Sequence, residues 1–306
     1  MLAEQVLQAV RDSRLLDGRE RIVAMVSGGR DSTCLLDVLV ALRGSQAVLA
    51  LHVNYGLRAE ADADAHHCAA LCDGLGVALE VVGAQRADAD APAPGAGNLQ
   101  AWAREVRYRA AERLAAAEGA LIATGHTSSD QVETILYRLA ASPGRRALLG
   151  MAPREGRLLR PLLGVTREQT AAYCSERGLR WREDASNLDE RYARTRVRHG
   201  LLPALRAVHP AAEANVLRTA LLLREETELL DALVAAELAG TQAITIARLA
   251  ELPPALARLV VVRLAEQATG AYVPQAGERV GEIVTLGRRG GRAELHVGGR
   301  AGAVIA

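Results

Sequence analysis

The sequence contains no lysine and no phenylalanine, so all 37 of its basic side chains are arginines. A chain without lysine has no lysine nucleophile, no Schiff-base lysine and no P-loop lysine to bind a phosphate. These three kinds of site are therefore excluded. Arginine and alanine stand in the place of the missing types, which indicates a compositional bias of the genome rather than a functional choice.

An excess of charge of one sign is also missing, because 37 basic and 36 acidic residues leave a formal net charge of +1. This balance does not indicate a polyanion-binding protein, and any such site must be a local patch. The chain has 306 residues, of which 50% are hydrophobic and 24% charged, an ordinary globular composition. The length suggests one large domain plus a small one, or two modest domains.

Cysteines are few, and no apolar run approaches the roughly 18 residues needed to span a bilayer. Four cysteines in a chain of this size do not make a disulfide framework, and none forms a Cys-x-x-Cys pair. Residues 1–20 are typical of an amphipathic helix that carries acids, which is not a signal peptide. We therefore expect a soluble, cytoplasmic protein that does not act at a membrane.

A short stretch of histidines and cysteines suggests a metal site, but its spacing disfavours one. Cys68 and Cys72 share one face of a predicted helix, whereas His66 and His67 point to different faces. No second half-site with zinc-like spacing is present. We predict buried cysteines on an amphipathic helix instead.

From residue 21 onward, short apolar runs alternate with helical stretches, a pattern that predicts an α/β domain on a doubly wound parallel sheet. The predicted strands cover 22–26, 47–53, 77–82 and 121–123. Loops are predicted over 83–97 and 140–165. Capping boxes at Ser128–Gln131 and Thr166–Gln169 are expected to begin two later helices.

The character of the sequence changes past residue 210. Long Leu/Ala/Glu helical patterns are followed by a Gly/Arg-rich end that is typical of short strands with turns. We therefore predict a first domain over 1–210 and a smaller, mostly helical domain over 211–306.

A glycine loop, Ser27-Gly28-Gly29-Arg30-Asp31-Ser32, connects the first predicted strand to the next helix. Backbone amides at a helix start, with glycines that allow close approach, form a cradle for an anion. A carboxylate such as Asp31 beside phosphates makes sense with a bridging Mg²⁺ or with a contact away from the phosphoryl oxygens. A tight turn before a capped helix is the alternative, but the place of the loop after the first strand favours phosphate binding.

The pattern Ser-Gly-Gly-x-Asp-Ser resembles that of the PP-loop ATP pyrophosphatases. Further stretches resemble motifs of one family among them, the tRNA(Ile)-lysidine synthetases. These stretches are His52 to Arg58, Asn98 to Tyr108, Ala123 to Thr134 and Asp184 to His199. The resemblance covers roughly residues 20–205 in the right order. The sequence departs from the family pattern at Tyr55, Ser129 and Thr195.

The resemblance implies an enzyme that takes ATP, Mg²⁺, free L-lysine and the tRNA(Ile) with a CAU anticodon. O2 of the wobble cytidine, position 34, would attack the α-phosphate of ATP and release pyrophosphate. The lysine amine would then displace AMP at C2 and so form lysidine. Amides of the glycine loop would stabilise the departing pyrophosphate.

The same motifs supply the candidate site residues. Asp31, His126 and Asp130 are expected to be catalytic, and Arg104 or Arg107 would neutralise the α-phosphate. Asp31 and Asp130 are the expected Mg²⁺ ligands. The expected ATP-binding residues are Ser27, Gly28, Gly29, Arg30, Asp31, Ser32, His52, Asn54 and Gly125.

Each of these assignments has a simpler structural alternative. Taken alone, Asp130 is typical of a helix cap. The sequence also leaves open whether His126 or Asp130 would assist deprotonation of the lysine amine. For Glu133, one turn further along the helix, the alternative is to orient Arg104 or Arg107. For these two arginines, which lie on a helix rich in other arginines, the alternative is a solvated face.

An arginine-rich stretch over 191–206 holds five arginines and no acid. Phosphate-backbone contact and stacking on unpaired bases fit such a local excess, and a solvated basic face is the alternative. The expected tRNA-binding residues are Arg191, Arg194, Arg196 and Arg198. We expect the C-terminal domain to bind the tRNA body. The oligomeric state, a homodimer included, is left open by the sequence.

Two other functions are weighed against this one. A tRNA thiolase also adenylates a base, but its chemistry usually calls for a persulfide-bearing cysteine or an iron–sulfur site. The lack of a Cys-x-x-Cys pair and the core-facing position predicted for Cys34 disfavour it. A nucleotide-binding protein without catalysis is disfavoured by the arginine-rich stretch and the second domain.

Overall fold

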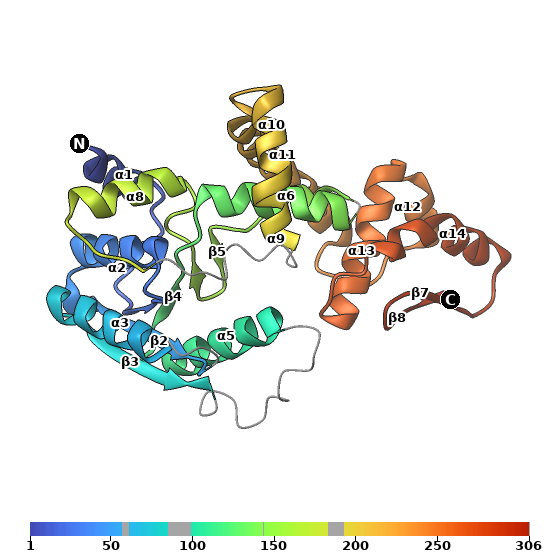
Figure 1. The fold of residues 1–306 in the computed structure, drawn as a ribbon. Coiled ribbons are helices and arrows are strands. Elements are labelled where there is room, and N and C mark those ends of the chain that lie inside the picture. The colour runs from blue at the N-terminus through green and yellow to red at the C-terminus, as the bar shows by residue number, and fades with distance from the viewer. Residues whose placement is uncertain (57–60, 85–98, 143, 183–192, 306) are drawn as a thin grey trace. The chain divides into compact units, whose positions relative to one another are not determined.

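The computed structural model describes residues 1–56, 61–84, 99–142, 144–182 and 193–305 (Figure 1). The chain divides into two compact units, Met1–Ala220 and Leu221–Ala306. The division falls inside the long helix α11 (Ala212–Leu238), near the predicted boundary at 210/211.

The first unit is built on a six-stranded sheet with the strand order β3-β2-β1-β4-β6-β5. Its strands are β1 (Ile22–Met25), β2 (Val48–Asn54), β3 (Ala78–Gly83), β4 (Leu121–Ala123), β5 (Arg154–Glu155) and β6 (Leu158–Leu159). Every neighbouring pair is parallel except β5 with β6. The predicted α/β class with a doubly wound, mostly parallel sheet is therefore confirmed.

Helices pack on both faces of this sheet, which is why its central strand is a continuous apolar run. Ile22 and Ala24 belong to the core that β1 forms with α1, α2, α3 and α8. Val23 and Met25 belong to a second core on the other face, which includes α5. Because successive side chains of a strand point to opposite faces, both sets must be apolar.

The helices of the first unit follow the predicted order. They are α1 (Leu2–Asp12), α2 (Arg30–Arg43), η1 (Ser45–Ala47), α3 (Ala61–Leu75), α5 (Leu99–Glu118), α6 (Ser128–Ala141), α7 (Arg145–Leu148), α8 (Arg167–Glu176), α9 (Ala193–Arg196), the π-helical turn η3 (Val197–Leu201) and α10 (Leu202–Val208). Residues 140–165 are rich in loops, as predicted, and also contain the short elements α7, β5 and β6. These three elements have only two to four residues each, too few to leave a periodic signal. Most of the loop predicted over 83–97 lies outside the described residues.

All four cysteines are buried free thiols, and Cys68 and Cys72 are 0% and 1% exposed on α3. The prediction of buried cysteines on this helix is therefore confirmed. Over the ranges that the structure describes, no three His, Cys, Asp or Glu side chains gather into a group suited to a metal ion.

The second unit has a hydrophobic core of its own, formed by helices and one hairpin. Its elements beyond α11 are α12 (Ile246–Glu251), α13 (Pro254–Thr269), η4 (Pro274–Arg279), α14 (Val280–Arg289), β7 (Ala293–Gly298) and β8 (Ala301–Ile305). The two strands are antiparallel. A search of the described helices finds none both long and apolar enough to cross a membrane.

Candidate active site

The glycine loop lies where β1 ends and α2 begins, as predicted. Gly29 is the N-cap of α2, so Arg30, Asp31 and Ser32 form the first turn of that helix. The Ser32 hydroxyl accepts a hydrogen bond from the Ser27 backbone N–H at 3.1 Å and donates to the Gly29 carbonyl at 2.8 Å. Gly28 has a φ of +79°, which only glycine adopts without strain. The loop is thus a turn held in shape by two serines beside the positive end of a helix dipole.

Gly125 brings a second strand end against this loop. A Cβ atom at position 125, two residues beyond β4, would lie 2.8 Å from the carbonyl oxygen of Asp31 and 3.1 Å from the amide nitrogen of Ser32. Only glycine therefore lets the β4–α6 connection approach the start of α2. Since β1 and β4 are neighbours in the sheet, the two segments meet at its carboxyl edge, where such folds bind ligands.

The capping box of α6 begins one residue earlier than predicted, at Thr127 instead of Ser128. Thr127 is the N-cap, and its hydroxyl accepts a hydrogen bond from the Asp130 backbone N–H. The Asp130 carboxylate accepts from the Thr127 backbone N–H at 2.9 Å and from the Thr127 hydroxyl at 2.8 Å. The predicted box of Ser128 and Gln131 is thus wrong. The N-cap is Thr127, and the residue three positions after it is Asp130, not Gln131. The box predicted at Thr166 and Gln169 is present and begins α8.

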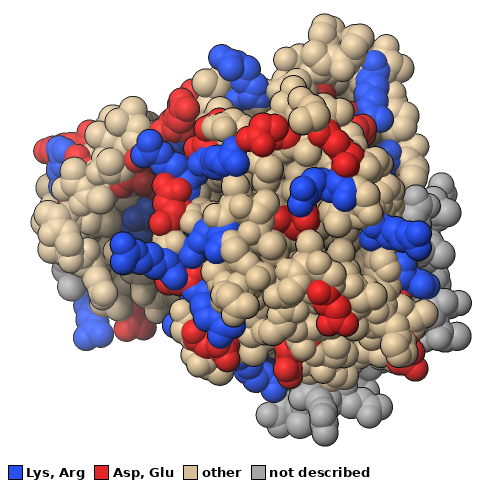
Figure 2. Space-filling view, turned by 90° about the vertical axis from the view of Figure 1, so that its left-hand side faces the viewer, with Lys and Arg blue, Asp and Glu red and all other residues tan. Residues whose placement is uncertain are grey.

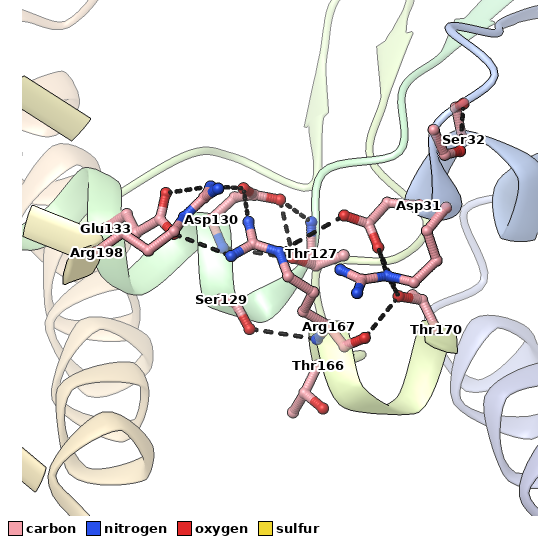
Figure 3. Close-up of polar contacts among 12 residues, drawn as sticks. Asp31, Ser32, Thr127, Ser129, Asp130, Glu133, Thr166, Arg167, Thr170 and Arg198 are labelled. Atoms are coloured by element: carbon pink, nitrogen blue, oxygen red, sulfur yellow. Dashed lines mark hydrogen bonds and ion pairs between the residues drawn. The ribbon is translucent and has the colours of Figure 1, made fainter. Parts of the chain in front are cut away.

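One arginine that the sequence reading missed lies at the centre of the site. Arg167, the first residue of α8, extends its guanidinium between three carboxylates (Figure 3). Its Nη2 lies 2.8 Å from Asp130 Oδ1, its Nη1 lies 3.2 Å from Glu133 Oε1, and its Nε lies 3.7 Å from Asp31 Oδ2. A single cation therefore joins the start of α2 to the first turns of α6.

Glu133 is bound by a second arginine from the arginine-rich stretch. Arg198 donates from Nε to Glu133 Oε1 at 2.7 Å and from Nη2 to Oε2 at 3.1 Å, a two-point contact with a side chain that is 2% exposed. Glu133 therefore contacts Arg167 and Arg198, and the prediction that it orients Arg104 or Arg107 is wrong. Sequence spacing alone gave no signal for this pairing, because Arg198 lies 65 residues further along the chain.

Asp31 is surrounded by donors from α8 as well as from its own helix. Arg30 Nε lies 3.0 Å from Asp31 Oδ1, and the Thr170 hydroxyl donates to the same oxygen. Together with Arg167, these groups hold the carboxylate at the end of the glycine loop (Figure 3).

The charges of the site follow from its burial and its arginines. Burial lowers the pKa of His126 to about 4, and Arg160, Arg104 and Arg107 add to this effect against the opposing carboxylate of Asp130. Burial tends to raise the pKa of Asp130, but Arg167 and the hydrogen bonds from Thr127 outweigh it, and the pKa is lowered. At neutral pH the site therefore holds a neutral imidazole, whose Nδ1 lies 2.8 Å from the Thr124 hydroxyl, beside an ionised aspartate.

His52 and Asn54 have partners within the protein. His52 is 5% exposed, and its Nδ1 contacts the Val26 carbonyl at 2.9 Å, at the end of β1. The Asn54 amide donates to Asp62 at 2.9 Å, and its oxygen accepts the Gly56 N–H at 2.9 Å. Both residues thus support the backbone around the site.

Two of the three departures from the family pattern have visible roles. Ser129 accepts a hydrogen bond from the Arg167 backbone N–H at 3.2 Å. Tyr55 donates to the Ala103 carbonyl at 3.0 Å and packs beside Trp102. Thr195 is buried, with 7% exposed.

The predicted arginines lie in separate environments. Arg104 lies over the ring of Tyr108, 4.5 Å from its centroid, on the same helix as Arg107. Arg194 donates to the Thr134 hydroxyl at 3.4 Å, and Arg191 lies outside the described residues. Arg196 lines a groove of about 350 Å³ between α6 and η3.

Arginines and acidic residues are interspersed on the face that Figure 2 shows. This distribution agrees with the near-zero net charge.

The strand order and a glycine loop at the carboxyl end of β1 define a nucleotide-binding α/β domain of the PP-loop kind. The sequence profile of the PP-loop domain matches residues 1–205. A tRNA(Ile)-lysidine synthase of Pseudomonas syringae pv. tomato is 44% identical over 227 residues, which are 72% of this chain and 49% of that relative. One of Nostoc sp. is 37% identical over 240 residues, which are 75% of this chain and 67% of that relative. The chain therefore belongs to the tRNA(Ile)-lysidine synthase family of PP-loop proteins.

The chain spans about half the length of the first of these relatives. Among solved structures, the U34-tRNA thiolase NcsA from Methanococcus maripaludis has a TM-score of 0.61 and 18% identity. The match covers 73% of this chain and 79% of that chain. At this identity the likeness shows the fold alone.

Proposed function

We propose that this chain ligates L-lysine to C2 of the wobble cytidine of the tRNA(Ile) with a CAU anticodon, with ATP converted to AMP and pyrophosphate. The membership in the tRNA(Ile)-lysidine synthase family carries the proposal. The site supports it, because the glycine loop and the helix start that follows it lie beside an ionised aspartate, Asp130, and a neutral histidine, His126.

The glycine loop would bind the pyrophosphate portion of ATP. Amides in the first turn of α2 and the hydroxyls of Ser27 and Ser32 supply donors to phosphate oxygens. A cytidine carbonyl oxygen is a poor leaving group until it becomes a phosphate ester, so adenylation must come first. Donors that favour pyrophosphate over bound ATP accelerate that step.

Asp31 fits a Mg²⁺ ion better than Asp130 does. Mg²⁺ bound with a nucleotide takes one or two carboxylates plus phosphate oxygens, and Asp31 lies in the first turn after the loop. Both oxygens of Asp130 accept hydrogen bonds, Oδ2 in the cap of α6 and Oδ1 from Arg167. In Asp31 the donors Arg30 and Thr170 share Oδ1. The contact of its Oδ2 with Arg167 is longer, at 3.7 Å. When bound, the ion would offset negative charge on the phosphates. We therefore propose Asp31 as its principal ligand.

Asp130 and His126 would receive the lysine amine. The Asp130 charge attracts an ammonium group, and the neutral His126 imidazole has a free nitrogen that accepts hydrogen bonds. Arg104 and Arg107, which lie within electrostatic range of His126, would offset charge on the α-phosphate. Arg194 and Arg196 of the first unit, together with the second unit, would contact tRNA in the cytoplasm.

The thiolase alternative finds no support in the cysteines. All four thiols are buried, and burial raises the pKa of Cys68 to about 12 and that of Cys72 to about 11. A persulfide carrier needs an accessible, low-pKa thiol.

Transfer of radiolabelled lysine to tRNA tests the proposed reaction. The protein is incubated with ATP, Mg²⁺, labelled lysine and total tRNA, with and without the substitution Asp31→Ala. We expect label in acid-precipitable RNA that resists mild alkali, since an ester at the 3′ end would hydrolyse, and we expect the variant to lose it. Formation of AMP with tRNA but without label would contradict lysine ligation.

A further inference from the structure

We propose that Arg167 is a positioning residue for this reaction, because its guanidinium fixes the nucleotide-side carboxylate of α2 relative to the amine-side carboxylates of α6. The inference deepens the proposed function and rests on it. Arg167 lies outside the four stretches that resemble the family motifs, and its guanidinium contacts carboxylates in both halves of the site.

Three nitrogens of one side chain serve three different carboxylates. The ion pairs join Nε to Asp31 at 3.7 Å, Nη2 to Asp130 at 2.8 Å and Nη1 to Glu133 at 3.2 Å. The planar guanidinium presents its donors in a fixed fork, so the hydrogen bonds to Asp130 and Glu133 set the directions of these two carboxylates, and the ion pair at 3.7 Å draws Asp31 toward the same cation.

The backbone of Arg167 is anchored to α6 as well. Its N–H donates to the Ser129 hydroxyl at 3.2 Å, and two residues earlier the Val165 carbonyl accepts the Ser128 N–H at 2.8 Å. The start of α8 and the start of α6 are therefore held together, and the guanidinium extends from this junction toward α2 (Figure 3).

Arg167 offsets the mutual repulsion of all three carboxylates, which no other contact among the described residues does. The Glu133, Asp130 and Asp31 side chains are 2%, 17% and 22% exposed, so water screens their mutual repulsion poorly. Arg198 contacts Glu133 closely and reaches Asp130 only at 3.9 Å. Without Arg167, the carboxylates of α2 and α6 would move apart.

A second arginine of the same helix offers a matched control. Arg177, just past the end of α8, binds the buried Asp37 of α2 with Nε–Oδ2 of 2.9 Å and Nη2–Oδ1 of 3.2 Å. It thus joins the same two elements, but its partner is not one of the three site carboxylates. A loss of activity specific to Arg167 cannot then come from a weakened α8–α2 contact alone.

The test compares Arg167→Ala, Arg167→Lys and Arg177→Ala in steady-state lysine transfer, with guanidinium ion added at non-denaturing concentration. We expect Arg167→Ala to lower kcat by about a hundredfold, as for an ångström-scale misplacement of reacting groups. Guanidinium should restore part of this loss. Arg167→Lys should recover little activity, since one ammonium group cannot contact three carboxylates at fixed angles. Arg177→Ala should keep kcat within a few fold of the parent.

A kcat for Arg167→Ala close to that for Arg177→Ala would overturn the proposal. So would a loss that guanidinium leaves unchanged and that parallels a loss of folded protein. Equilibrium binding of ATP gives a readout that needs no lysine transfer. Without the cation of Arg167, the three carboxylates should repel the phosphates and weaken ATP binding at least fivefold in Arg167→Ala, whereas Arg177→Ala should bind ATP like the parent. A parent protein that binds ATP but transfers no lysine would contradict the proposed reaction and leave this binding comparison valid.

Discussion

Removal of the Glu133 side chain provides a sharp test of the charge network. Glu133 is 2% exposed and accepts from Arg167 Nη1 at 3.2 Å and from Arg198 Nε and Nη2 at 2.7 and 3.1 Å. Breaking a buried ion pair by removing one partner costs about 3–5 kcal/mol. The two arginines are 21% and 26% exposed, so water can solvate them in part. We therefore expect Glu133→Ala to cost about 3 kcal/mol, at the lower end of that range.

Tryptophan fluorescence reports this cost for the first unit alone, because Trp102 and Trp181 are the two tryptophans of the chain. For a unit of this size, about 3 kcal/mol corresponds to a Tm lowered by roughly 6–12 °C. The control is Glu105→Ala, which removes an exposed i,i+4 pair with Arg109 and should cost about 0.3–0.5 kcal/mol. Equal Tm values for the two variants would refute the reasoning that the network is effectively buried.

Three further predictions concern nucleotide binding, pH and tRNA. Gly125→Ala should weaken ATP binding at least tenfold, since the new Cβ would lie 2.8 Å from the Asp31 carbonyl oxygen. In the control Gly74→Ala the new Cβ would have nothing within 4 Å, so ATP titrations should be unchanged. Equal ATP affinities of the two variants would contradict the close approach at Gly125. The pKa of His126 is about 4 in the folded state against 6.5 ordinarily, so the unfolded chain binds this proton first and stability falls as pH drops from 6.5 to 4. His126→Asn should flatten that slope by up to about 1.4 kcal/mol per pH unit, and an unchanged slope in denaturation at several pH values would count against it. Arg196→Ala should reduce the salt dependence of tRNA binding by about one ion, and an unchanged salt slope would remove Arg196 from the interface.

The sequence sufficed for the elements whose signal is local. Alternation of buried runs with amphipathic helices predicted the parallel sheet, and the glycine loop was found at its place after β1. Thr166 and Gln169 formed the predicted capping box because both partners lie within one turn.

The rest of the site depends on contacts between distant residues. Arg167 is the first residue of an ordinary capped helix, and nothing nearby in the sequence shows that three acids from α2 and α6 surround it. Glu133 likewise has its partners 34 and 65 residues away. The strands β5 and β6 are two residues long, so they are defined only by the pairing of β6 with β4 and of β5 with β6.

Nucleoside analysis of the modified tRNA tests the central claim most directly. The tRNA(Ile) with a CAU anticodon is incubated with the protein, ATP, Mg²⁺ and lysine, digested to nucleosides, and examined by mass spectrometry beside a reaction without ATP. We expect the wobble cytidine alone to carry lysine, and only in the reaction with ATP. An unmodified wobble cytidine, with ATP still converted to AMP, would contradict the proposed function.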